Sequence, residues 1–128
     1  MDETLSPPYH LSFEPREKYL YAYVEGEHDN YAITKAFWLE IAAETNRIGA
    51  THVLIDENIV ETVSMADVFQ FASELPKLGF DGIRVAFVDR YLEQHELNQF
   101  GELVAVNRGF NGKAFNNFEE AEAWLLAG

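Results

Sequence analysis

Polar side chains that could do chemistry gather directly after three of the apolar segments of this sequence. They are Glu25, Glu27, His28, Asp56, Glu57, Asp89 and Arg90. Carboxylate oxygens in such a group could bind Mg²⁺ or Ca²⁺, and paired carboxylates with a histidine could transfer protons. Their spacing matches no fixed metal-binding motif, however, and loop acids are common in so acidic a chain. We therefore interpret these residues as solvated loop charge.

A second candidate is Ser64, which stands just before the apolar positions of a predicted helix. A phosphate on Ser64 would meet backbone N–H groups and the positive end of the helix dipole. Asp67 and Glu61 are close in sequence and would repel that phosphate. We therefore predict that Ser64 is a helix N-cap, with Asp67 in a variant of the capping box, worth about 1 kcal/mol.

Other kinds of site are excluded by missing residue types or motifs. The chain has no cysteine, so disulfides, zinc–thiolate sites, iron–sulfur clusters and thiol catalysis are excluded. No G-x-S-x-G, G-x-G-x-x-G or P-loop pattern occurs. We expect no enzyme activity, no metal and no cofactor, and we interpret every histidine as structural or exposed. The histidines, which do not share metal-ligand spacing, are His10, His28, His52 and His95.

The net charge bears on the partners of the protein. With 22 acidic and 9 basic residues, the chain carries a formal charge of −13. Such a field repels phosphate backbones and anionic lipid surfaces, so nucleic-acid binding is disfavoured. No apolar run approaches the roughly 18 residues of a membrane span, and the first residues lack a signal pattern. We expect no membrane insertion and a cytoplasmic location.

Hydrophobic periodicity predicts the elements that would position these residues. Strands are expected at 9–13, 19–26, 51–56, 83–89 and 112–115, and helices at about 30–48, 64–78, 91–107 and from 117 onward. The order β-β-α-β-α-β-α-β-α favours a largely parallel sheet with right-handed crossovers and one antiparallel edge. Residues 1–8 are expected to be a flexible lead-in and 9–128 a single domain. The stripes that the helices would bury include Ile48, Met65, Phe69 and Leu103.

The predicted helices and strands carry more large aromatic side chains than one face of each element can bury. Phe69 and Phe71 stand two apart on a predicted helix, so they cannot share a face. This surplus favours a homodimer interface or an apolar ligand cavity, and a thick core in a small domain explains it equally well. The candidates for an interface or a ligand site are Tyr19, Tyr21, Tyr23, Trp38, Phe69, Phe71 and Phe100.

Several segments in this order resemble a known family. They are VEGEHDN at 24–30, AFWLEIA at 36–42, VLID at 53–56, RVAFVD at 84–89, VAVNRGF at 104–110 and FNNFEEAEAWL at 115–125. Together they resemble uncharacterised bacterial STAS-like proteins of the SpoIIAA-like fold, which anti-sigma factor antagonists and CRAL-TRIO lipid-binding domains share. The resemblance covers residues 9–127. It implies an α/β fold with a mixed, mostly parallel five-stranded sheet and four helices.

The resemblance implies regulatory protein contact or apolar-ligand binding, and no enzyme chemistry. In STAS antagonists a serine at the position of Ser64 is phosphorylated by a partner kinase, but the Asp-Ser-Ser-Gly context of that switch is absent here. Our first hypothesis is a non-enzymatic regulatory module that forms a homodimer. It would contact a protein partner through residues 57–69 and the surplus aromatics. The alternative is a carrier or sensor of a lipid or quinone, with Phe69, Phe71 and Phe100 on the cavity wall.

Overall fold

The computed structural model describes residues 8–60 and 63–128 of the chain. The lead-in predicted for residues 1–8 therefore lies, except for Pro8, outside the described residues, as do Glu61 and Thr62. Within the described ranges, strands and α-helices follow one another in the order β-β-α-β-α-β-α-β-α. The order predicted from hydrophobic periodicity is confirmed.

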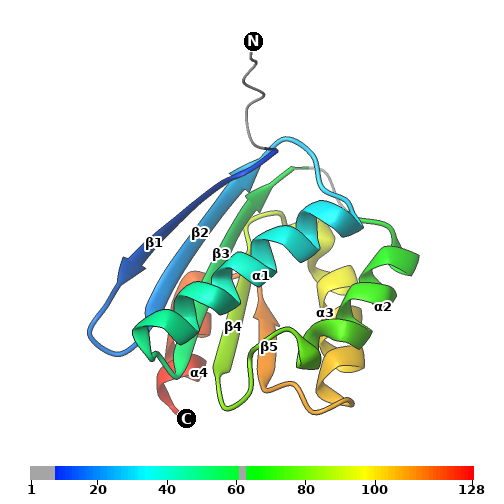
Figure 1. The fold of residues 1–128 in the computed structure, drawn as a ribbon. Helices are drawn as coiled ribbons and strands as arrows, with labels where there is room; N and C mark the ends of the chain where they lie inside the picture. The colour runs from blue at the N-terminus through cyan, green and yellow to red at the C-terminus, as the bar shows by residue number, and fades with distance from the viewer. Residues whose placement is uncertain (1–7, 61–62) are drawn as a thin grey trace.

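The strands form one mixed sheet in the order β1-β2-β3-β4-β5 (Figure 1). They are β1 (His10–Pro15), β2 (Leu20–Gly26), β3 (His52–Ile59), β4 (Arg84–Asp89) and β5 (Gly112–Phe115). β1 pairs with β2 in the antiparallel sense, and the other neighbouring pairs are parallel. The predicted mixed, mostly parallel sheet is therefore confirmed, and the carboxyl ends of β2 to β5 meet at one edge of it.

The helices cover the two faces of the sheet unequally (Figure 1). On one face lie α1 (Tyr31–Ile48), α2 (Met65–Glu74) and α3 (His95–Val106), and on the other α4 (Phe118–Leu126) packs against β3, β4 and β5. Side chains alternate along each strand, so Leu20 and Val24 of β2 enter the core under the three helices, while Tyr19 just before β2 enters the core under α4. β2 is thus apolar on both faces, as its sequence predicts.

Helix α1 begins and ends at the residues that the sequence marks. The side chain of Asn30 accepts a hydrogen bond of 2.9 Å from the N–H of Ile33, which caps the first turn. Gly49 ends the helix in the left-handed conformation, with φ of 74°. A side chain at that φ would be strained, so glycine is the favoured residue there.

Three predicted boundaries shift in the structure. α2 ends at Glu74 and is followed by a 3₁₀ turn, Leu75–Lys77, because Pro76 has no N–H for the α-helical pattern. The third predicted helix starts with another 3₁₀ turn, Leu92–Gln94, before α3. β3 runs to Ile59, beyond the predicted end at 56, so Glu57 belongs to the strand and not to a loop.

Some residues expected in buried stripes are exposed, and the prediction is wrong for them. Phe69 is 47% exposed, whereas Phe71 on the same helix is only 8% exposed. Apolar residues two apart allow two helix orientations, and packing of α2 against α1 and α3 selects the one that buries Phe71. The residues placed wrongly are Ile48, Met65, Phe69 and Leu103.

Candidate functional site

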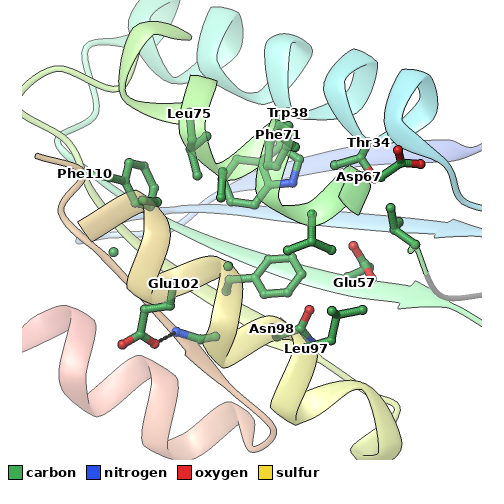
Figure 2. A pocket seen from close by; sticks show the side chains of 18 of the residues that line it. Thr34, Trp38, Glu57, Asp67, Phe71, Leu75, Leu97, Asn98, Glu102 and Phe110 are labelled. Carbon is green, nitrogen blue, oxygen red and sulfur yellow. Dashed lines mark hydrogen bonds between the residues drawn. The ribbon is translucent and has the colours of Figure 1, made fainter. Parts of the chain in front are cut away.

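A cavity of about 100 Å³ lies between α1, α2, α3 and the sheet face that they cover (Figure 2). Most of its wall is aliphatic or aromatic. An apolar cavity of about 150 Å³ is known to admit benzene, so this smaller space has room for an apolar body smaller than benzene. The apolar lining includes Trp38, Val68, Phe71, Ala72, Leu75, Phe87, Leu97, Ala105 and Phe110.

Trp38 of α1 is the centre of the aromatic part of this wall. Its ring centroid lies 5.4 Å from that of Phe71 on α2 and 5.7 Å from those of Phe80 and of Phe87 on β4. Phe110, after α3, lies at 6.4 Å. Such ring contacts are each worth roughly 0.5–1.5 kcal/mol beyond burial. They join α1, α2 and β4 around the cavity.

One end of the cavity is built from carboxyl groups. Glu57 of β3 and Asp89 of β4 are neighbours in the parallel register of the two strands. Because side chains alternate along a strand, Glu57 shares the face of Ile55, which belongs to the core under the three helices. Glu57 is 5% exposed and Asp89 is 1% exposed. Asp29, from the segment before α1, is also buried and lines the cavity with Glu57.

Asp29 and Asp89 both accept hydrogen bonds from groups on neighbouring elements. The hydroxyl of Thr34 on α1 donates to Oδ1 of Asp29 at 2.6 Å. Oδ1 of Asp89 accepts from the backbone N–H of Tyr91 at 2.9 Å, and its Oδ2 accepts from the amide of Asn98 on α3 at 2.8 Å. These bonds hold the two carboxyl groups in fixed positions.

Glu57 differs from its two neighbours in its hydrogen bonding. None of the described residues donates a hydrogen bond to its carboxyl group, which lies on the cavity wall between Thr34 and Asn98 (Figure 2). Burial raises the pKa of Glu57 well above its usual range, and the negative charges of Asp89 and Asp29 raise it further. The carboxyl group therefore stays protonated over a pH range in which exposed glutamates are ionised.

Burial also raises the pKa of Asp89, while its bonds from Asn98 and Tyr91 act in the opposite direction. The amide of Gln94, which lines the same end, donates to the carbonyl oxygen of Val60 at 3.2 Å. The polar end of the cavity is thus an acidic group in which two members have donors and Glu57 has none within the described residues.

The opposite end of the cavity is closed by a contact between α3 and the edge strand β5. Oε1 of Glu102 accepts a hydrogen bond of 2.8 Å from the backbone N–H of Ala114, drawn as a dashed line in Figure 2. Gly101 lets α2 approach closely, because a Cβ atom there would lie 3.0 Å from a methyl group of Val68. Glu102 therefore connects α3 to the edge strand β5 beside the cavity.

The interpretation of the acids after the apolar segments as solvated loop charge is wrong for Asp56, Glu57 and Asp89, which are buried strand residues, and the seven polar residues do not form one site. Asp56 lies on the other sheet face, where its carboxylate accepts from Arg90 Nε and Nη2 at 3.2 and 3.1 Å and from the Tyr21 hydroxyl at 2.5 Å. Burial and the bond to Asp56 raise the pKa of Tyr21 to about 12. The guanidinium carbon of Arg90 lies 5.0 Å from the ring centre of Tyr23. This is a closed polar network, and it is separate from Glu57.

The remaining members of that group lie in a third place. Glu25, Glu27 and His28 line an open groove beside His10, at the edge where β1 and β2 meet. Neighbouring strand positions such as Asp56 and Glu57 face opposite sides, which explains why consecutive acids separate. Among the residues that the structure describes, no group of three or more histidine, aspartate or glutamate side chains could hold a metal ion.

Ser64 is the N-cap of α2. Its Oγ accepts a hydrogen bond of 3.1 Å from the backbone N–H of Asp67, the geometry that the sequence predicts for a cap. That Ser64 is not also a phosphorylation switch stays a prediction.

The structure separates the aromatic candidates. Trp38 and Phe71 line the cavity. Phe69 faces solvent, with the guanidinium carbon of Arg108 at 5.6 Å from its ring centre, so its predicted place on the cavity wall is wrong. Phe100 packs against the core beside the cavity and is not part of its described lining. Tyr19 is buried under α4, where its hydroxyl donates to Glu122 at 2.6 Å.

The sequence analysis missed the polar partners of the acidic end. Thr34, Gln94 and Asn98 were not identified, although each faces the carboxyl groups from a helix or turn. One signal could have located the site. Aligning HVLIDE with RVAFVD as adjacent parallel strands places Glu57 beside Asp89 on the face of Ile55.

The comparisons with known proteins concern the fold. No family model matches the chain, and no curated protein matches it. An uncharacterised DUF3478-family protein with a SpoIIAA-like fold from Shewanella loihica aligns with a TM-score of 0.55 and 16% identity, over 98% of each chain. An anti-sigma factor antagonist from Mycobacterium paratuberculosis aligns with a TM-score of 0.60 and 16% identity, over 95% of this chain and 99% of the other.

The fold is SpoIIAA-like. The expected STAS-like architecture is confirmed at the level of the fold, since identity this low is silent on activity. None of the helices described in this SpoIIAA-like structure is both long enough and apolar enough to cross a bilayer. The role of the cavity and of its acidic end must therefore be inferred from the residues of this chain.

Proposed function

We propose that this SpoIIAA-like protein is a non-enzymatic regulatory module that binds a small, mainly apolar ligand in the cavity under α1, α2 and α3. The observation that carries the proposal is Glu57, which is buried, lines the cavity and receives no hydrogen bond from the described residues. Because this carboxyl group faces the cavity, a ligand there can supply the hydrogen bond that the described residues do not.

The neighbours of Glu57 favour binding over catalysis. The carboxyl groups of Asp29 and Asp89 accept bonds that fix them in place. The described lining contains neither histidine nor serine that could act as a base or a nucleophile beside Glu57. The expected cytoplasmic location is part of this proposal.

The test is to fill the cavity from α3. Ala105 is buried and lines the cavity, so Ala105→Leu would occupy the space that a ligand needs. The matched control is Ala123→Leu, at an exposed position of α4 on the other sheet face. Native mass spectrometry of freshly purified protein should show a small-molecule adduct on the wild type and on the control, but not on Ala105→Leu. Repeated absence of any adduct, or an adduct that survives in Ala105→Leu, would refute ligand binding.

A second candidate function is contact with a protein, in the first instance a second copy of this chain. Val60 and Met65, on either side of the connection from β3 to α2, are 63% and 62% exposed, and Phe69 is exposed one turn further along α2. We call these three residues the α2 surface. One structural neighbour is an anti-sigma factor antagonist, which supports a regulatory role for a protein of this fold.

Light scattering after size-exclusion chromatography tests this contact. If the α2 surface forms a homodimer, Met65→Glu should convert the dimer to a monomer. Leu126→Glu, which places the same charge at an exposed apolar position of α4, should leave the mass unchanged. A wild-type protein that is monomeric at tens of micromolar would exclude the homodimer and leave a different protein as the partner.

A further inference from the structure

The polar end of the cavity presents hydrogen-bond acceptors, while its donors are directed elsewhere. The hydroxyl of Thr34 donates to Asp29, and the amide of Asn98 donates to Asp89. The amide of Gln94 donates to a backbone carbonyl group. What remains at this end are the carboxyl groups of Glu57 and, from α2, of Asp67. In their ionised form these carboxyl groups only accept hydrogen bonds, so that form is complementary to a ligand that carries N–H donors.

The charge around Glu57 has one sign. Asp29 precedes α1, Asp89 ends β4, and Asp67 lines the cavity from α2. Lys113 of β5 also borders the cavity, but its ammonium group lies 5.8 Å from the ring centre of Phe115 on the other sheet face, so its charge does not face the ligand space. Tyr31 lines the cavity from α1, and its hydroxyl donates to Glu74 at 2.5 Å. Charges interact more strongly in an apolar interior than in water, so this end repels an anionic group and attracts a cation.

The rest of the cavity fixes the size and character of the ligand. Its volume of about 100 Å³ is smaller than that of a cavity that admits benzene. Trp38, Phe71 and Phe87 supply aromatic walls, and aromatic faces also attract cations. The body of the ligand is therefore a short alkyl chain or a small ring.

We infer that the ligand is a small amine in its cationic form, with its ammonium group against Glu57 and its apolar body between the aromatic walls. This inference rests on the proposed ligand binding and adds the chemical class. Binding includes a proton transfer to solvent: the carboxyl group of Glu57 loses its proton, the amine keeps its own, and the resulting carboxylate pairs with the ammonium group. One proton is released for each amine that binds.

The test uses three probes of similar size: n-pentylamine, the neutral acceptor 2-hexanone and the anion pentanoate. Their affinities are measured by ¹⁵N–¹H NMR titration of the cavity resonances between about pH 5 and pH 8, and the proton count by calorimetry in two buffers. We expect n-pentylamine to bind tightest, with release of one proton. Its affinity should rise up to about tenfold per pH unit below the pKa of Glu57.

Two variants separate recognition from general effects. Glu57→Gln should weaken n-pentylamine at least about tenfold at the highest pH and abolish the pH dependence. Glu96→Gln removes a carboxylate from an exposed position of α3. It should change neither the affinity for n-pentylamine nor its pH dependence. Tighter binding of 2-hexanone or pentanoate, or amine binding without proton release, would overturn the amine assignment and leave ligand binding standing. If no probe shifts the cavity resonances, both the assignment and the proposed function fail.

Discussion

Replacing Glu57 with glutamine probes the electrostatics of the cavity through the stability of the protein. Glutamine has nearly the size and polarity of a protonated glutamate but cannot ionise. In the folded protein, burial and then the charges of Asp89 and Asp29 raise the pKa of Glu57 well above its usual range. In the unfolded chain the same carboxyl group titrates near about 4.3. The two states therefore bind different numbers of protons between these pKa values.

The sign and size of the effect follow from this difference. Below about pH 4.3 both states are protonated, and the stability that comes from the raised pKa is fully present. As the pH rises toward the folded pKa, the unfolded chain gains stability by losing its proton, and the wild-type free energy of unfolding falls by about 1.4 kcal/mol per pH unit. The free energy of unfolding of Glu57→Gln does not fall in this way, because glutamine cannot ionise. The variant should therefore match the wild type near about pH 4 and exceed it increasingly at higher pH.

The assay is urea unfolding followed by far-ultraviolet circular dichroism, at several values between about pH 4 and pH 8. Each variant is compared with the wild type at the same pH, so that contributions of other groups, including the raised pKa of Asp89, cancel. The control is Glu17→Gln in the exposed turn between β1 and β2, whose difference from the wild type should be flat. A flat difference for Glu57→Gln would refute the reasoning, because it would mean that Glu57 ionises as easily in the folded protein as in the unfolded chain.

Further predictions concern the cap, the orientation of α2 and the fixed carboxyl groups. Ser64→Ala should lower the free energy of unfolding by about 1 kcal/mol, and Ser64→Asp should restore it, because aspartate caps equally well; equal losses in urea unfolding would contradict the cap. Phe71→Ala should cost about 3–5 kcal/mol, whereas Phe69→Ala should change stability by about 0.5 kcal/mol or less; similar losses would contradict the orientation of α2. Asn98→Ala should raise the pKa of Asp89 further, since the Asn98 bond lowers it, and carbon-13 NMR titration measures this shift; an unchanged or lower pKa would argue against that bond.

The fold was predictable because its information is local. Alternation of apolar residues marked β1, apolar runs marked β2, β3 and β4, and α1 is delimited by the capping residue Asn30 and by Gly49. The boundaries that shifted depend on finer effects. Pro76 converts the end of the second helix into a 3₁₀ turn, and β3 extends past its last aliphatic run because β2 and β4 continue beside it.

The site was less predictable because it depends on register and helix rotation. Asp56 and Glu57 are adjacent and chemically alike, yet one pairs with Arg90 on one sheet face and the other lines the cavity on the opposite face. The choice between Phe69 and Phe71 follows from packing of α2 against two other helices. No pattern within a single segment contains such information.

The acid surplus of the chain therefore has two physical meanings. Most of the 22 acidic residues can keep the protein soluble, but Glu57 is buried, lines a cavity and is expected to lower stability as the pH rises, because burial raises its pKa. A residue that costs stability in this way is typical of a site maintained for function. The two experiments on Glu57→Gln are thus linked. If the variant gains stability and loses the amine, one carboxyl group accounts for both effects, because the proton that the free folded protein keeps as the pH rises is the proton that binding releases. If it gains stability and still binds n-pentylamine as the wild type does, the cost of Glu57 has another origin.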